Sequence, residues 1–302
     1  MKARILIFVL MFTGAVSYAQ QDAQYTDYMY NTINVNPAYA GSRGALSIFG
    51  LHRTQWSGID GAPVTNSFSM NTPINESNIG VGLSFVNDKI GPTTSNDISA
   101  DVSYTLRTSD IYKLSFGVKA SANIIDLNTS DLNAVDPSDP TLQNYNNFTP
   151  NVGVGVYFHS EKLYLGLSVP NIIETNNYND NDVAMYKENA SLYFIAGYVF
   201  DLGYRFKFKP ALLTKMVQGA PLQADLSANF MYDNKFVLGA AYRWDAAVSL
   251  MAGFQVYEGL FIGYAYDYDT TDLGNYNSGS NEIFLRFELF KNFNKIVSPR
   301  FF

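Results

Sequence analysis

The chain has 302 residues, enough for one large domain or two ordinary ones, and its formal net charge is −7 at pH 7. Charged residues make up only 16 % of the chain, while 22 Tyr and 22 Phe bring the aromatic share to 15 %. The acidic balance argues against a nucleic-acid partner, and the absence of Cys excludes disulfides, thiolate metal sites and a cysteine nucleophile.

The N-terminus has the pattern of a cleaved secretory signal. Two basic residues precede the almost wholly apolar run 5–16, and Ser17 and Ala19 are small residues at the positions that a signal peptidase reads. We predict a signal peptide over residues 1–19 with cleavage after Ala19. An uncleaved membrane anchor is the alternative, but the run is shorter than the roughly 20 residues that span a bilayer as a helix.

The rest of the chain alternates apolar and polar residues with a period of two. No run of 18 successive apolar residues follows the signal, yet residues 98–107, 113–123 and 222–232 each place apolar side chains on one face and polar side chains on the other. About fourteen such segments occur, most of them about ten residues long, which is the length of a tilted membrane-crossing strand. The predicted strands are 44–54, 63–72, 78–87, 97–108, 112–123, 150–160, 162–170, 189–201, 203–213, 221–232, 235–243, 247–256, 259–268 and 281–290.

Short and long connections alternate between these strands. Tight polar turns are expected at 109–110, 160–161, 233–234 and 257–258, and longer connections at 88–96, 124–149, 171–188, 214–220 and 269–280. This pattern predicts an all-β fold, a transmembrane antiparallel outer-membrane β-barrel of about 14 strands with short periplasmic turns and long extracellular loops. A secreted β-sandwich is the alternative.

The predicted domains are the signal peptide 1–19, an N-terminal periplasmic or lumen-plug segment 20–43, and the barrel 44–302 with a short periplasmic C-terminal tail. A barrel of this size is too wide for wall side chains alone to fill. The sequence leaves open whether residues 20–43, the long loops or a partner fill the lumen.

Two segments break the strand alternation. In the first, Pro37 forces Asn36 towards extended geometry and Gly41 can supply a turn, so residues 34–41 are expected to fix how the chain enters the barrel. The second is a compact loop at the first hairpin, which we interpret either as a structural rim loop or as a contact surface for a protein partner. The candidate partner-binding or structural residues are Asn36, Pro37, Tyr39, Gly41, Gln55, Trp56, Gly58, Asp60, Gly61 and Pro63.

Residues that could carry chemistry are sparse, and no catalytic, metal or cofactor site is predicted. The only histidines, His52 and His159, lack the spacing of a metal motif, and His159 is expected to be solvated or interfacial. The acidic loop stretches at 179–182 and 267–272 are expected to be ordinary solvated carboxylates. Lumen-facing charges such as Asp101 and Lys119 are expected to pair across neighbouring strands, with a selective pore lining as the alternative. Glycine pairs such as Gly80 and Gly82 are expected to be small lumen-facing residues.

The off-pattern motifs resemble those of the PorP/SprF family of Bacteroidetes outer-membrane proteins, which is associated with type IX secretion and gliding. The resemblance covers nearly the whole chain: the signal, the Asn-Pro-Ala-Tyr-Ala-Gly motif at 36–41, Gln-Trp-Ser-Gly-Ile-Asp-Gly-Ala-Pro at 55–63, and Tyr-Leu-Gly-Leu-Ser-Val-Pro-Asn-Ile at 164–172. One departure from barrels in general is the tail 291–302 after the last strand, which leaves open whether Phe290 or Phe302 is read during assembly.

The resemblance implies a non-enzymatic role and a location as an integral protein of the cell outer membrane. The implied partners are a secreted cell-surface adhesin with a type IX C-terminal signal domain or another type IX cargo, periplasmic lipoprotein or ring components of the secretion machinery, and outer-membrane lipid. Asn36, Pro37, Tyr39 and Gly41 would then order the periplasmic entrance, and the 55–63 loop would face the partner. The competing function is a pore or transporter for small solutes.

Overall fold

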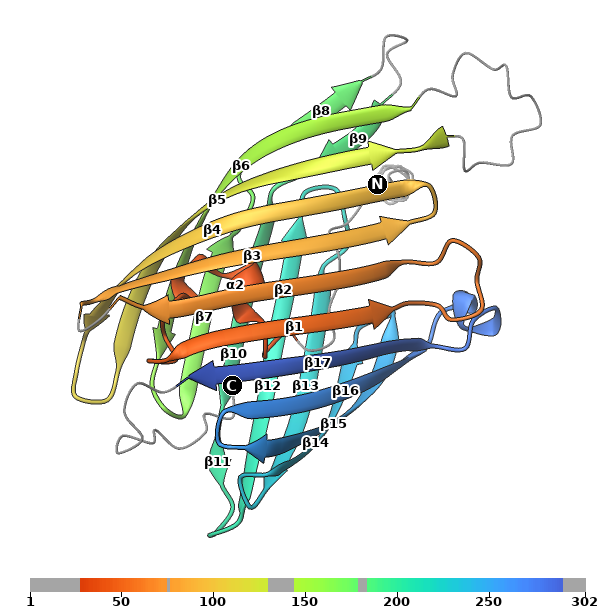
Figure 1. Ribbon diagram of the computed structural model, residues 1–302. Coiled ribbons are helices and arrows are strands. Elements are labelled where there is room, and N and C mark those ends of the chain that lie inside the picture. The colour runs from red at the N-terminus through yellow and green to blue at the C-terminus, as the bar shows by residue number, and fades with distance from the viewer. Residues whose placement is uncertain (1–27, 75–76, 130–143, 179–183, 290–302) are drawn as a thin grey trace, which may run out of the picture.

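Fourteen antiparallel strands close into a barrel in the computed structural model, which describes residues 28–74, 77–129, 144–178 and 184–289 (Figure 1). The predicted signal peptide and C-terminal tail lie outside these residues. The strands are β1 (Leu46–Thr54), β2 (Val64–Pro73), β3 (Ile79–Ile90), β4 (Thr93–Arg107), β5 (Lys113–Leu127), β6 (Tyr145–His159), β7 (Leu163–Val169), β8 (Thr175–Tyr178), β9 (Ala184–Glu188), β10 (Ser191–Tyr198), β11 (Phe200–Asp201), β12 (Phe206–Val217), β13 (Gln223–Tyr232), β14 (Phe236–Arg243), β15 (Ala247–Tyr257), β16 (Leu260–Asp269) and β17 (Ser280–Leu289).

Two pairings close the ring. The first strand β1 pairs with the last strand β17, and β10 pairs with β12, so that no wall strand is left with a free side. The two-residue β11 continues β10, and β8 and β9 pair only with each other beyond β7 and β10, which leaves fourteen strands in the wall. Closure satisfies the backbone hydrogen bonds within the wall, as hydrocarbon requires.

Helical structure is minor in the part of the chain that the structure describes. The short helices are α2 (Thr32–Val35), η1 (Pro37–Tyr39) and η3 (Asp272–Asn275). Among the described residues, no helix is long and apolar enough to cross a membrane.

The wall strands place apolar side chains on the outside of the barrel and polar side chains on the inside, the reverse of a water-soluble protein. On β4, the side chains of Ile98, Val102 and Tyr104 point outward and are about half exposed, whereas Asp101 and Ser103 on the same strand are 1 % exposed. The same division runs along the other wall strands, because successive side chains of a strand point to opposite faces. The predicted barrel is therefore confirmed, with an apolar outer surface and a polar lumen.

The two ends of the barrel differ. We call the end with the connections 74–78, 108–112, 160–162, 199–205, 233–235 and 258–259 the turn end, and the opposite end the loop end. One long connection was wrongly predicted at the loop end: residues 88–96 form no loop, because Asp88 pairs with Ser95 and Ile90 with Thr93 around a turn at Gly91. The predicted loop 171–188 likewise contains the β8–β9 ribbon.

Candidate functional site

The chain that precedes β1 lies inside the barrel. Residues 28–45, here called the inner segment, are buried except for half-buried Asn34 and Gly41 and exposed Gly44. Figure 1 shows α2 of this segment behind β1, β2 and β3 and within the ring of strands. The inner segment therefore covers polar side chains on the lumen face of the wall.

The motif at residues 36–41 has the local geometry that its residue types dictate. Asn36, before the proline, is extended with φ −140° and ψ 108°, and its Oδ1 accepts a hydrogen bond from Ala38 N at 3.0 Å to cap η1. Pro37 occupies the first helical position, where its missing N–H costs nothing. Gly41 has φ +70°, which a side chain would disfavour.

A row of small residues forms the seat for this motif. Five neighbouring strands, β3 to β7, place a glycine or serine at directly paired positions: Gly80, Ser103, Gly117, Gly155 and Ser168. A Cβ on Gly80 would overlap Ala40 O, one on Gly117 the backbone of Pro37 and Ala38, and one on Gly155 the Asn36 carboxamide. The absence of these side chains lets the inner segment lie directly on the wall.

Hydrogen bonds fix the motif in the seat. Ser103 Oγ donates to Ala40 O at 2.7 Å, and Ser168 Oγ donates to Val35 O at 2.6 Å. Asn36 Nδ2 donates to Val156 O at 3.0 Å. These bonds satisfy buried backbone oxygens that would otherwise be costly in a water-poor lumen.

Further bonds tie the rest of the segment to β2 and β5. Ser67 Oγ accepts from Asn31 Nδ2 at 3.1 Å and from Asn34 Nδ2 at 3.0 Å. Ser69 Oγ donates to Asn31 Oδ1 at 2.8 Å, and Lys119 Nζ donates to Asn34 O at 3.0 Å.

Tyr30 anchors the segment to the opposite wall. Its ring stacks on Phe261 at a centroid separation of 5.3 Å and contacts Phe284 in a tilted arrangement at 4.8 Å. The Lys209 ammonium lies 5.2 Å from the ring centroid and the Arg286 guanidinium 5.4 Å from it. Two cations on one aromatic ring make this a specific contact as well as an apolar one.

Buried ion pairs line the remaining lumen. Asp101 lies 3.8 Å from Lys119 on the neighbouring strand, as expected for charges on the lumen face. Other pairs join Arg243 to Asp225 at 2.8 Å, and Arg43 of the inner segment to Glu288. Such pairs keep the charges compensated where water is scarce.

The loop 55–63 is held at the loop end by two neighbouring connections. Ser57 exchanges backbone hydrogen bonds of 2.8 Å with Gly279 and Ser278, and Gly91 N donates to Gly61 O at 2.8 Å. Trp56 N donates to Ser280 Oγ at 3.2 Å. The strand order brings these contacts together, because β17 and β2 both border β1.

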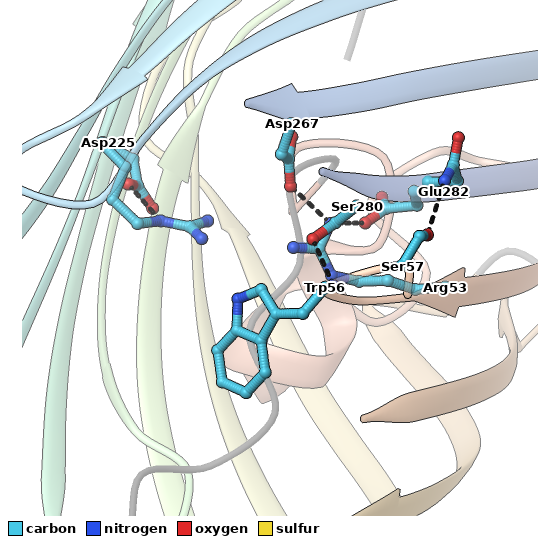
Figure 2. A network of polar contacts seen from close by, with 9 residues as sticks. Arg53, Trp56, Ser57, Asp225, Asp267, Ser280 and Glu282 are labelled. Carbon is cyan, nitrogen blue, oxygen red and sulfur yellow. Dashed lines mark hydrogen bonds and ion pairs between the residues drawn. The ribbon is translucent and has the colours of Figure 1, made fainter. Parts of the chain in front are cut away.

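Trp56 is half-buried, with a positive φ of 46°, and Figure 2 shows its indole pointing away from β1 and β17. Beneath the loop, Arg53 Nη1 lies 2.7 Å from Asp267 Oδ2 and 3.0 Å from Glu282 Oε2 (Figure 2). Gly58 and Gly61 also have positive φ values, and Asp60 is exposed. The loop therefore has a defined shape with its acidic tip in solvent.

The structure thus gathers the candidate residues into two groups. Asn36, Pro37, Tyr39 and Gly41 lie together in the seat, whereas Gln55 to Pro63 lie at the loop end, with β1 between the groups. Sequence reasoning missed the wall half of the seat, namely Ser103, Gly117 and Ser168. The glycine pairs of the strands were the available signal.

Two expectations about single residues were wrong. His159 is 1 % exposed and stacks on Tyr157, because it lies on the inward face at the end of β6 and is not solvated there. Asp267 is buried and paired with Arg53, so it is not a solvated loop carboxylate. The acidic stretch 179–182 lies outside the described residues.

An exposed ion pair between Lys162 and Asp201 lies at the turn end, outside the strands that cross the membrane. Lys162 Nζ lies 2.7 Å from Asp201 Oδ2, and this hydrogen bond raises the pKa of Lys162 above its ordinary value. Both side chains are about half exposed, so water screens the pair.

An apolar belt around a closed β-barrel defines an integral protein of the bacterial outer membrane. Solved structures of this class share the fold: the Ralstonia pickettii toluene transporter TbuX (TM-score 0.50, 8 % identity, 84 % of this chain and 91 % of that one) and the CymD monoaromatic hydrocarbon channel (TM-score 0.50, 10 % identity, 86 % and 98 %). No curated protein sequence matches the chain. The family described as type IX secretion system membrane protein PorP/SprF matches residues 17–287, and the chain belongs to this family.

Proposed function

We propose that the protein is a plugged, non-enzymatic barrel of the type IX secretion and gliding machinery that helps to secrete, retain or anchor a large cell-surface protein. Membership of the family supports the setting in type IX secretion. The observation that supports the proposal is the inner segment, which is buried inside the barrel, whereas an open solute pore would leave its lumen clear.

The inner segment crosses the lumen from wall to wall. Asn36 bonds to Val156 on β6, and Tyr30 stacks on Phe261 on β16. In the closed order of strands, β6 and β16 are seven strands apart in a ring of fourteen, which places them on opposite walls. A plug attached to both walls supports a role in holding a partner rather than in conducting solutes.

The inward-facing polar groups support a structural role as well. Lys119, Ser103 and Ser168 bond to the inner segment, and Arg53, Asp225 and Glu288 form ion pairs. Among the residues that the structure describes, no group of three His, Cys, Asp or Glu side chains could hold a metal ion.

The loop end is the proposed surface for the cargo. In outer-membrane barrels the short turns face the periplasm, so the 55–63 loop faces the cell exterior. We infer that this shaped loop contacts the secreted adhesin or another type IX cargo with a C-terminal signal domain. Lipoprotein or ring components of the machinery would meet the turn end from the periplasm.

Conductance separates this proposal from the competing solute pore. Purified protein in planar bilayers should show no steady open conductance, because the inner segment blocks the lumen. A version that lacks residues 28–41 but stays heat-modifiable on gels should conduct. Steady conductance of the unaltered protein would contradict the plug and favour the pore.

Retention of the partner tests the loop. Trp56→Ala should leave the barrel heat-modifiable but reduce the amount of the large surface protein that co-purifies from native envelopes. The matched control is Trp244→Ala, which removes the other tryptophan from an exposed turn at the same end of the barrel. Equal retention by both variants would remove Trp56 from the proposed contact surface.

A further inference from the structure

A row of hydrogen-bonded polar side chains crosses the outward face of four neighbouring strands. His52, Asn66, Asn87 and Asn96 occupy directly paired positions on β1, β2, β3 and β4. His52 Nδ1 lies 2.8 Å from Asn66 Oδ1, Asn66 Nδ2 donates to Asn87 Oδ1 at 3.4 Å, and Asn87 Nδ2 donates to Asn96 Oδ1 at 2.9 Å. We call these four residues the outer ladder.

The apolar belt is narrow where the ladder begins. From the turn end, β1 presents Leu46, Ile48 and Gly50 outward before His52 interrupts the apolar face. Three strands along the ring from β1, β15 presents five apolar residues outward in succession: Val248, Leu250, Ala252, Phe254 and Val256. The belt is thus shorter over β1 than over β15.

The depth of the ladder follows from strand geometry. His52 lies six residues from the turn end of β1, and Asn66 lies seven residues from the turn end of β2. With a rise of about 3.3 Å per residue and a tilt of about 40°, these positions are roughly 15 and 18 Å above the turn end. An ordinary apolar belt is about 25 Å tall, so both residues lie at the depth of hydrocarbon.

The ladder therefore needs a polar neighbour outside the barrel. Each Asn amide has two N–H donors, and the bonds along the ladder use one donor of Asn66 and one of Asn87. His52 and Asn66 are exposed on the outward face. Leaving amide N–H groups in hydrocarbon costs more than a local change of bilayer thickness.

We propose that the outer leaflet is thinned over β1 and β2, with lipid headgroups drawn down to contact His52 and Asn66 of the outer ladder. Directly below the ladder, Phe68, Phe85 and Ile98 are 47, 39 and 52 % exposed on β2, β3 and β4. This apolar surface continues the lipid-facing belt without a break, so lipid is the occupant that the surroundings favour. Lys89, exposed one row above Asn87, adds a cation for a headgroup phosphate.

Spin-label accessibility tests the proposal directly. The chain has no Cys, so Asn66→Cys and Leu250→Cys can each be labelled at a single site. Both positions lie seven residues from the turn end of their strands, which matches their depth. In phosphatidylcholine vesicles, the label at Asn66→Cys should meet a water-soluble nickel reagent several-fold more often than the label at Leu250→Cys, and molecular oxygen less often.

Two outcomes would overturn the proposal. Equal, oxygen-dominated accessibility at both sites would place Asn66 in ordinary hydrocarbon. Exclusion of both reagents at Asn66→Cys would show that a second copy of the chain covers the ladder instead of lipid.

A second measurement avoids disturbing the ladder with a label. Insertion of the unaltered protein should fall several-fold when the acyl chains of the vesicles are lengthened, whereas Asn66→Leu with Asn87→Leu should lose much of this dependence. The same dependence on chain length in both proteins would contradict the proposal, even if the labelled variants fold poorly.

Discussion

Adding one methyl group to the seat should release the plug without breaking the wall. Gly117→Ala places a Cβ where the backbone of Pro37 and Ala38 lies, and Gly155→Ala places one on the Asn36 carboxamide. In both cases the atoms nearest to the added methyl group belong to the inner segment and not to the neighbouring strands. The pairing of β5 with β4 and β6 should therefore persist while the inner segment loses its place.

The magnitude follows from the contacts. Overpacking of a close contact costs about 1 to 3 kcal/mol, and the bonds of Asn36 to Val156 and of Ser103 to Ala40 add about 1 kcal/mol each if they break. The total of about 3 to 5 kcal/mol would lower the ratio of seated to unseated molecules by roughly 100-fold to 1000-fold or more, since 1.4 kcal/mol is a factor of ten.

Planar-bilayer conductance measures the release, and heat modifiability on gels measures the fold. Gly117→Ala should stay heat-modifiable and open conducting states that the unaltered protein lacks. Gly50→Ala is the matched control, because it also adds a methyl group to a wall strand but meets nothing within 4 Å. Conductance of Gly117→Ala no higher than that of Gly50→Ala, in folded protein, would refute the seat.

Three other predictions concern the anchors and the ion pairs. Tyr30→Ala removes a buried aromatic anchor worth about 3 to 5 kcal/mol and should also raise bilayer conductance, whereas Ser103→Ala should raise it less, at about 1 to 3 kcal/mol. A Tyr30→Ala protein as silent as the unaltered one would show that the seat alone holds the plug. Arg53→Met leaves two buried carboxylates without their cation, so the urea midpoint should fall by an amount equivalent to about 3 to 5 kcal/mol. Lys162→Ala breaks a solvent-screened pair and should leave that midpoint unchanged within error, and a comparable fall in both would contradict the difference in burial.

The wall of the barrel could be read from the sequence because it depends on local geometry. A strand alternates its side chains by twos, so alternation in residues 98–107 predicts both a strand and its two faces. His159 shows the limit of this reasoning. Its position near a turn favoured a solvated side chain, but strand parity and the filled lumen bury it.

Of the candidate site, the sequence determined the inner half. Pro37 and Gly41 departed from strand alternation and marked residues 36–41 as a segment with its own geometry. That segment does adopt a capped turn with a positive φ at Gly41. What the turn rests on could not be derived, because Gly117 and Gly155 each look like an ordinary small strand residue.

Only the tertiary structure decided what fills the barrel. Strand register aligns Gly80, Ser103, Gly117, Gly155 and Ser168 into one seat, and a shift of one residue in any pairing would turn a strand's small residue outward. Ring closure likewise sets Tyr30 against Phe261, more than 200 positions later in the chain. Backbone periodicity is local and appears in any short window of sequence, whereas contacts across the lumen exist only once fourteen strands have closed around the segment.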